Sequence, residues 1–212
     1  WTVSRGVGSN DWQLLGAVGR GGTAAARHAC HDDCVPGGNA AAQIPSEGPF
    51  ACIASAAGSF PCNNVDLDRW LSVADLGGGS GNDSWGWTDP ASGREYAIYG
   101  RSTGTSFIDV TSPAAPVYLG DLPTHSSSSD WRDIKVFAGH AFIVSEATGH
   151  GLQVFDLAAL ENVASPPVTF SETAHYAGFS TAHNVAVNED SGFAFVVGSD
   201  QCAGGLYMLD VS

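Results

Sequence analysis

Short apolar runs separated by turn residues dominate the middle of the chain. Residues 134–137, 141–144 and 152–157 are three such runs, rich in β-branched and aromatic side chains, which favour strand over helix. Ala138-Gly139 and Thr148-Gly149 lie between the runs, where tight turns need residues that accept unusual backbone angles. The pattern predicts a three-stranded antiparallel meander. A lone meander cannot bury both of its faces, so it needs neighbouring sheets.

The same succession of runs recurs on both sides of this meander. The third run of each copy ends in an aspartate, at steps of roughly 50 residues: Asp109, Asp156 and Asp210. The second run recurs as well, as Tyr96-Ala97-Ile98-Tyr99, Ala141-Phe142-Ile143-Val144 and Ala194-Phe195-Val196-Val197. Two motifs that return in the same order indicate a repeated unit.

A fourth, outer strand completes the predicted unit. Residues 116–119 follow the first copy with the sequence PVYL, and residues 166–170, PPVTF, are expected to take the same outer place in the second copy. Four-stranded units that repeat at about 45–50 residues are typical of β-propeller blades. We therefore predict an all-β fold, a β-propeller made of four-stranded antiparallel blades. A single irregular β-sandwich is the alternative.

The repeat divides the chain into two parts. Residues 1–65 do not repeat and are loop-rich, so we expect an N-terminal arm or cap that contains disulfide-bonded cysteines. Residues 66–212 hold the blades, at about 82–125, 126–175 and 176–212. These are about three blades, whereas closed propellers have 4–8. We expect an incomplete ring that further copies of the chain, a protein partner or the rest of a longer chain completes.

The charge balance excludes some partners. The 212 residues include 22 acidic and 8 basic side chains, a formal net charge of −14. Such a surface repels nucleic acid and anionic lipid, so we expect no nucleic-acid binding. No apolar run approaches the roughly 20 residues of a membrane helix, so we expect no membrane span. The acidic loops could hold calcium, although solubility alone also explains them.

The five cysteines suggest an oxidising compartment, and hence an extracellular or cell-surface protein. Cys52 and Cys62 flank a segment of small residues and are candidates for one disulfide. Cys30 and Cys34 lie in the run HACHDDC, where we favour a disulfide over zinc, because four ligands so close in sequence can rarely close a tetrahedron. The odd count leaves Cys202 free or paired with a cysteine elsewhere.

Polar residues near the start of the innermost strands are the first candidates for chemistry, because these strands line the central channel of a propeller. We select His125, Asp133, His183 and Asn184 there. Imidazole and carboxylate groups that converge on a channel could bind a transition metal or act as general acid and base. Hydrogen bonds from these groups to the backbone at strand ends are the alternative. Asn82 begins an N-glycosylation pattern, which matters only in a secreted eukaryotic protein.

A set of tryptophan and histidine motifs runs through residues 52–212. The motifs are FPCNNVDL at 60–67, WGWTD at 85–89 with GREYA at 93–97, WRDIKV at 131–136, HAFIVSE at 140–146 and AHN at 182–184. With these motifs the chain resembles the LVIVD-type β-propeller repeat and is similar to the choice-of-anchor B extracellular proteins. The resemblance implies a secreted or surface-attached propeller with further blades, and a cysteine in such further sequence as the partner of Cys202. It implies no catalytic residues.

The sequence leads to two functional hypotheses. The first is a secreted or cell-surface propeller that acts as a binding or structural assembly module, in a larger extracellular complex or filament. The second is a metal-dependent enzyme or redox protein with a His/Asp site at the channel. The repeat, the acidity and the cysteines favour the first hypothesis, so enzymatic activity is the less favoured of the two.

Overall fold

The structure is a computed structural model that describes residues 2–5, 12–15 and 45–212 of the chain. It is all-β, with 43% strand and no α-helix in the described part. The chain divides into two compact units, Trp1–Ser72 and Val73–Ser212, and each is described by itself. Within the described ranges, no helix is long and apolar enough to cross a membrane.

The described part of the first unit consists of two short hairpins and loops. Strand β1 (Thr2–Arg5) pairs antiparallel with β2 (Trp12–Leu15). Strand β3 (Ala56–Ala57) pairs antiparallel with β4 (Phe60–Pro61). Isolated bridges that join Glu47 to Trp70 and Phe50 to Leu67 hold the chain before and after the second hairpin side by side.

Three of the cysteines lie in the described part of the chain, where the disulfide prediction can be compared with the structure. Cys52 and Cys62 form a disulfide with their Cα atoms 5.8 Å apart, so the predicted pair is confirmed. The predicted pair of Cys30 and Cys34 lies outside the described residues. Cys202 is exposed and has no disulfide partner among the described residues.

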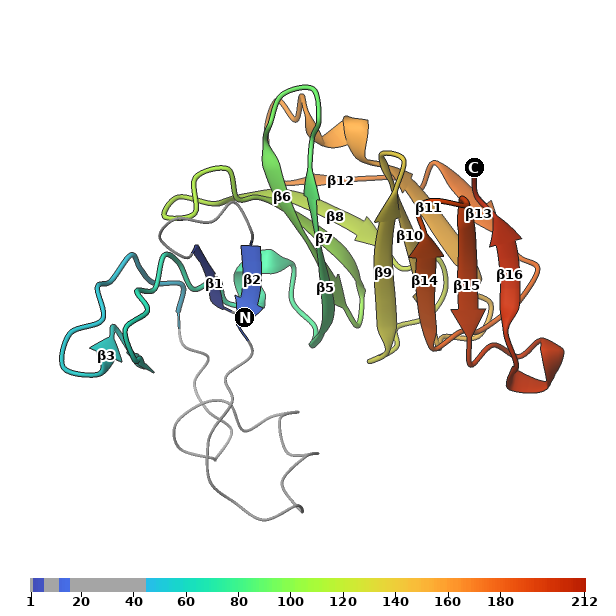
Figure 1. The fold of residues 1–212 in the computed structure, drawn as a ribbon, viewed down its shortest axis with the longest axis horizontal. Helices are drawn as coiled ribbons and strands as arrows, with labels where there is room; N and C mark the ends of the chain where they lie inside the picture. Colours follow the sequence, from blue (N-terminus) through green and yellow to red (C-terminus); the bar gives the residue numbers. More distant parts are fainter. Residues whose placement is uncertain (1, 6–11, 16–44) are drawn as a thin grey trace, which may run out of the picture. The chain divides into compact units, whose positions relative to one another are not determined.

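Three sheets follow one another along the second unit (Figure 1). The first sheet has the order β12-β8-β7-β6-β5, with strands β5 (Gly81–Thr88), β6 (Glu95–Arg101), β7 (Gly104–Asp109), β8 (Val117–Pro123) and β12 (Val168–Thr169). The second has the order β13-β11-β10-β9, with strands β9 (Arg132–Phe137), β10 (His140–Ser145), β11 (Leu152–Asp156) and β13 (Ala174–Tyr176). The third has the order β14-β15-β16, with strands β14 (Asn184–Asn188), β15 (Phe193–Val197) and β16 (Tyr207–Asp210). Single 3-10 turns interrupt the loops as η1 (Ala74–Leu76), η2 (Leu157–Leu160) and η3 (Cys202–Gly204).

The first strands of the three sheets form a row. Strand β9 contacts β5 on one side and β14 on the other, as Figure 1 shows. The remaining strands of each sheet run outward from this row in chain order, as the predicted meanders require.

Three aspartates end the third strand of their sheets. Asp109, Asp156 and Asp210 are the last residues of β7, β11 and β16, and they pair with Tyr96, His140 and Phe193 on the neighbouring strands. Each carboxylate Oδ1 accepts a hydrogen bond from the backbone N–H two residues later, at 2.9, 3.0 and 3.1 Å. This local bond ends the strand and starts the turn. The prediction that the three aspartates hold equivalent places is confirmed.

The same pairing corrects the alignment of the second runs. Ala97, Ala141 and Ala194 each stand one residue after the partner of the aspartate, opposite Ile108, Phe155 and Leu209. The equivalent of Ala141-Phe142-Ile143-Val144 in the first sheet is therefore Ala97-Ile98-Tyr99-Gly100. Our sequence alignment, which began the first copy at Tyr96, was wrong by one residue.

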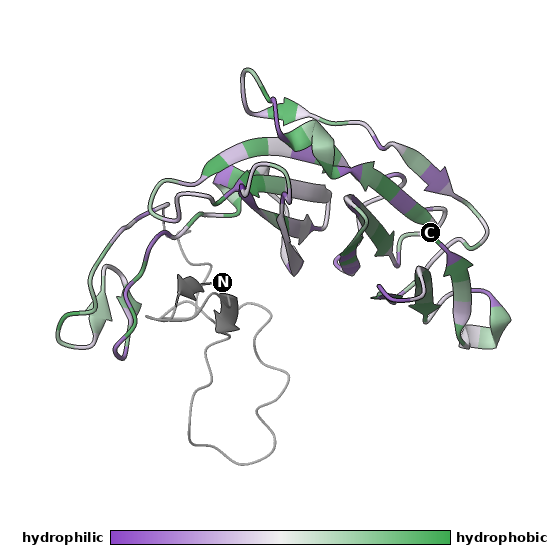
Figure 2. Ribbon diagram, turned by 45° about the horizontal axis from the view of Figure 1, so that its top comes forward, coloured by the Kyte–Doolittle hydropathy of each residue, from purple (hydrophilic) through white to green (hydrophobic). Residues whose placement is uncertain are grey.

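Two apolar layers lie between the sheets. The first joins the first and second sheets and includes Ile98, Phe107, Ile143 and Phe155. The second layer joins the second and third sheets through side chains that include Phe142, Val144, Val185, Ala194 and Val196. In Figure 2 hydrophobic residues run along the strands of all three sheets, interrupted by single hydrophilic ones. The second sheet is thus covered on both faces, which explains its nearly unbroken apolar runs.

One predicted strand belongs to a different sheet. We expected residues 166–170 to form the outer strand of the second copy of the repeat, but β12 pairs in parallel with β8 of the first sheet. The outer strand of the second sheet is β13, which pairs with β11. The ring of Phe170 explains the difference, because it packs edge-on against Phe107 and Phe155, at centroid distances of 5.4 and 5.2 Å, in the first apolar layer.

Candidate functional site

Carboxylates on the row of first strands join each sheet to the next. Asp83 on β5 accepts a hydrogen bond from the backbone N–H of Ile134 on β9, at 2.9 Å. Asp133, the residue before Ile134, accepts one in turn from the backbone N–H of Val185 on β14, at 2.7 Å. Asn82 adds a parallel bond from the N–H of Arg132, at 2.7 Å. The repeated bond fixes the spacing of neighbouring sheets at their inner edges.

A shallow depression opens along this row. It is lined by Asn82, Asp83, Trp131, Arg132, Asp133, His183 and Asn184. Three of the four residues selected from the sequence, Asp133, His183 and Asn184, therefore lie together. The fourth, His125, is part of a different group, described below.

Two of the three selected residues in the depression, Asp133 and His183, already have partners of other kinds. Asp133 uses one oxygen for Val185 and the other for the ammonium group of Lys135, at 2.8 Å. His183 pairs through Nδ1 with Glu146. The bond from the Val185 N–H is of the kind that the hydrogen-bonding alternative expects, and a metal role for these residues stays a prediction. An acid–base role for these residues stays a prediction.

Asp83 is a titrating group of this depression whose pKa its environment clearly alters. The pKa of its carboxyl is raised from 3.8 to about 6, chiefly by burial and also by the neighbouring charge of Asp133. The hydrogen bond from the Ile134 N–H and the charge of Lys135 act against these effects. The carboxyl of Asp83 thus carries a proton under mildly acidic conditions.

The raised pKa predicts a specific pH dependence of stability. The folded protein holds a proton on Asp83 between pH 4 and 6 that the unfolded chain has lost, so its free energy of unfolding falls as pH rises through this interval. Asp83→Asn keeps an oxygen for the Ile134 N–H and removes this dependence. Relative to the wild type, we expect the free energy of unfolding of the variant to rise by about 1 kcal/mol between pH 4 and pH 7, after allowance for solvent screening.

Urea denaturation of both proteins at several pH values checks this expectation. Titrating groups distant from Asp83 contribute equally to both proteins, so the difference between the two profiles reports on Asp83 and its interaction with Asp133 and Lys135. Asp190→Asn, in the exposed β14–β15 turn, is the matched control and should follow the wild-type profile. Parallel profiles for Asp83→Asn and wild type would contradict the assignment.

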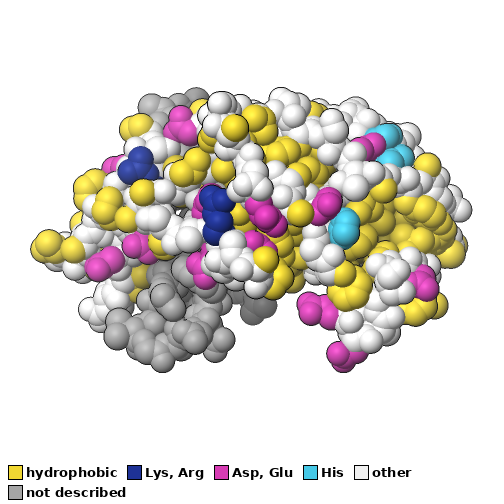
Figure 3. Space-filling model, turned by 90° about the horizontal axis from the view of Figure 1, so that it is seen from above, with side chains coloured by type: hydrophobic (Ala, Val, Ile, Leu, Met, Phe, Trp, Pro, Cys, Tyr) yellow, Lys and Arg dark blue, Asp and Glu magenta, His cyan; other side chains and the backbone are white. Residues whose placement is uncertain are grey.

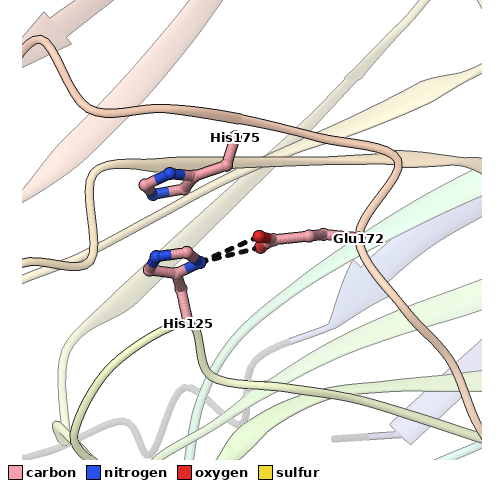
Figure 4. A group of neighbouring side chains, drawn as sticks. All are labelled: His125, Glu172 and His175. Carbon is pink, nitrogen blue, oxygen red and sulfur yellow. Dashed lines mark hydrogen bonds and ion pairs between the residues drawn. The ribbon is translucent and has the colours of Figure 1, made fainter.

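His125 lies with Glu172 and His175, and Figure 4 shows the three side chains together. His125 Nδ1 stands 2.9 and 3.1 Å from the two carboxylate oxygens of Glu172. The rings of His125 and His175 are stacked, with centroids 3.5 Å apart and planes 5° from parallel. One nitrogen or oxygen from each residue lies within 4.8 Å of the others. His125 comes from the connection between β8 and β9, and the other two from the segment that forms β13.

Buried polar residues hold this group in place. His175 Nε2 donates to the carbonyl oxygen of His150, at 2.8 Å. Gln153 donates to Glu172 Oε2 at 2.9 Å and to the carbonyl of Pro123 at 3.1 Å. His150 is fully buried, and burial together with the charge of Arg132 lowers its pKa to about 4, so its ring is neutral near pH 7. The group is therefore anchored to the interior of the second sheet.

Sequence reasoning found one member of this group and missed two. His125 was selected, whereas Glu172 and His175 were not. The available signal was position: His125 stands two residues after β8, Glu172 stands two residues before β13, and His175 lies in β13 itself. That signal could be used only if the outer strand of the second sheet was assigned to β13.

The glycosylation candidate Asn82 is a strand residue whose Oδ1 accepts a hydrogen bond from the Arg132 N–H.

Comparisons of this chain with family models, with curated proteins and with solved structures find no match, so the family resemblance of the repeat stays a prediction.

Proposed function

We propose that the chain is an extracellular β-propeller module, with its three sheets as successive blades, and that it binds protein through the open face of the third sheet. The disulfide between Cys52 and Cys62 supports an oxidising compartment. The row of first strands and the equivalent aspartates support successive blades. The proposal agrees with the resemblance of the repeat to the choice-of-anchor B proteins.

The open face of the third sheet repeats a face that is buried in the other sheets. Ile98, in the first sheet, packs in the layer shared with the second sheet. Its equivalent Phe142 packs in the layer shared with the third sheet. The next equivalent is Phe195, opposite Met208 on β16, and the third sheet is followed by no further sheet in the described chain. The pattern of the repeat therefore predicts a fourth sheet against Phe195.

The accessibilities support this conclusion. Phe142 and Val144 are 5% and 0% exposed, whereas the equivalent Val197 is 39% exposed and Met208 is 59% exposed. Figure 3 shows hydrophobic side chains gathered at the right, the side on which Figure 1 places the third sheet. A sheet that is apolar on both faces is typical of an internal position in a stack.

Asn184 is the observation that carries the proposal. Asp83 and Asp133 each accept a hydrogen bond from a backbone N–H of the next sheet, and Asn184 holds the third place in this series. Within the described residues, its exposed side chain has no hydrogen-bond partner of this kind. An amide oxygen beside an open apolar face is what a further first strand of the same design would meet.

The occupant we propose is a second copy of this chain. Continuity is the argument, because the chain itself contains two interfaces of this kind and both join sheets of the same repeat. Pairing of copies that each supply three sheets gives a ring of about six blades, within the range of closed propellers. The two net charges of −14 oppose association at low salt, and salt near 0.15 M screens them.

Sedimentation velocity or native mass spectrometry in about 0.15 M salt tests the proposal. We expect a species of twice 21.8 kDa that dissociates on dilution. Met208→Glu places a charge on the open face and should give monomer. Ala159→Glu adds the same charge at an exposed position of η2, which follows β11 of the second sheet, and should leave the dimer intact because both faces of that sheet are already covered. A wild-type monomer at all concentrations, or a Met208→Glu dimer, would overturn the proposal.

A further inference from the structure

We propose that His125, Glu172 and His175 form a Zn²⁺ site that fastens the outer strand of the second sheet. Two imidazoles and one carboxylate are a known protein ligand set for zinc, with the fourth position left to water or another ligand. The site is independent of the open face of the third sheet. No residue of the depression at the first strands takes part in it.

The distances suit a common ion. Bonds of about 2.0–2.1 Å at the tetrahedral angle place two zinc ligands about 3.3 Å apart. His125 Nδ1 and the Glu172 oxygens are already 2.9 and 3.1 Å apart. All three donors lie within 4.8 Å of one another, so ordinary side-chain rotations bring them onto one ion.

The surrounding contacts orient the donors. The hydrogen bond from His175 Nε2 to the carbonyl oxygen of His150 places the ring proton on Nε2 and leaves the Nδ1 lone pair free for the ion. Gln153 holds the carboxylate of Glu172 and is itself held by Pro123. Such bonds to the outer side of metal ligands are a regular feature of zinc sites.

The stacked rings add an electrostatic argument. With centroids 3.5 Å apart, the rings of His125 and His175 repel each other if both carry a proton charge. A bound ion keeps both imidazoles neutral and receives one lone pair from each. The carboxylate of Glu172 then offsets part of the charge of the ion. Figure 4 shows this carboxylate pointing toward His125.

The position of the site gives it a structural role. Strand β13 is held to β11 by only three residue pairs, which begin with Leu152 opposite Tyr176 and end with Val154 opposite Ala174. His125 belongs to the connection that leaves the first sheet. Zinc bound between them ties β13 to that connection and so joins the outer edges of two sheets. The exposed side of His125 leaves a path for the ion.

Zinc binding by the full chain tests the inference. Residues 28–34 hold two cysteines and two histidines, which are zinc-ligand residue types, so the measurements use a Cys30→Ser, Cys34→Ser background to exclude their contribution. After chelator treatment and dialysis against ZnCl₂, elemental analysis should find one equivalent of zinc. Isothermal titration calorimetry should show binding about 100-fold weaker, or lost, in His125→Ala and in His175→Ala.

His140→Ala is the matched control, because His140 is the first residue of β10 and its Nδ1 bonds to the carbonyl of Ala138, away from the three proposed ligands. It should keep the full equivalent. His125 is exposed, so its variant remains informative even if His175→Ala fails to fold. Zinc should also raise the melting temperature of the background protein and leave that of His125→Ala unchanged. Absence of a stoichiometric ion, or equal binding by His125→Ala, would overturn the inference.

Discussion

Phe155→Ala is expected to lower the free energy of unfolding of the second unit by about 3–5 kcal/mol. Phe155 is 1% exposed and lies at the centre of the layer between the first and second sheets. Its ring stacks on Phe107 with centroids 4.5 Å apart and meets the edge of Phe170. Truncation removes both ring contacts and leaves a cavity between two sheets, whose spacing is held elsewhere by hydrogen bonds, so the walls can collapse only partly.

Urea denaturation monitored by circular dichroism measures this loss. Phe155→Leu is the graded control, because leucine refills most of the volume and should cost less than about 1.5 kcal/mol. A loss below 1 kcal/mol for Phe155→Ala would show that the layer between the two sheets is not a packed core. In that case the description of the sheets as a stack would be wrong.

Local patterns explain why the sheets could be predicted from the sequence. Each meander is encoded by apolar runs of the right length and by turns at fixed places, such as Ala138-Gly139 with φ values of +48° and +75°. The aspartates at 109, 156 and 210 act through bonds to their own backbone two residues on, so their role does not depend on distant parts of the chain. Such local signals can be recognised from the sequence alone.

The place of β12 could not be predicted, because it depends on a distant contact. The sequence of residues 168–170 fits an outer strand of either sheet. Phe170 enters the layer between Phe107 and Phe155, and Gly120 makes room for β12, since a Cβ there would stand 1.9 Å from the carbonyl oxygen of Val168. Glycine also accepts the φ of +139° at this position. Neither condition is visible in residues 168–170 alone.

The candidate metal group was missed for the same reason. Glu172 and His175 reach His125 only because β12 leaves the outer position of the second sheet to β13. By contrast, Asp133, His183 and Asn184 were found together because each stands at a fixed place relative to the start of a first strand. Features that follow the repeat can thus be predicted from the sequence. Features that depend on a strand of one repeat joining the sheet of another cannot.

Asp133→Ala is expected to lower the free energy of unfolding by about 2–3 kcal/mol. The change leaves the N–H of Val185 without its acceptor at a position that is 1% exposed, and it removes the ion pair with Lys135. Asp133→Asn keeps an oxygen for Val185 and also removes the charge that opposes ionisation of Asp83. We therefore expect the asparagine variant to lose less than about 1 kcal/mol.

The equivalent residue of the third sheet provides the decisive comparison. Asn184→Ala should change the stability of the monomer by no more than about 0.5 kcal/mol, because Asn184 is exposed and the described chain offers its side chain no N–H. Hydrogen exchange adds a local measurement: the Val185 amide should exchange faster in Asp133→Ala, while the Ile134 amide, held by Asp83, keeps its protection. Equal losses of unfolding free energy for Asp133→Ala and Asn184→Ala would contradict this description, in which Asp133 bonds to the next sheet and Asn184 of the third sheet has no such bond. The expected difference ties the stability of each sheet to the presence of the next, which is the physical reason to look for a partner at the open face.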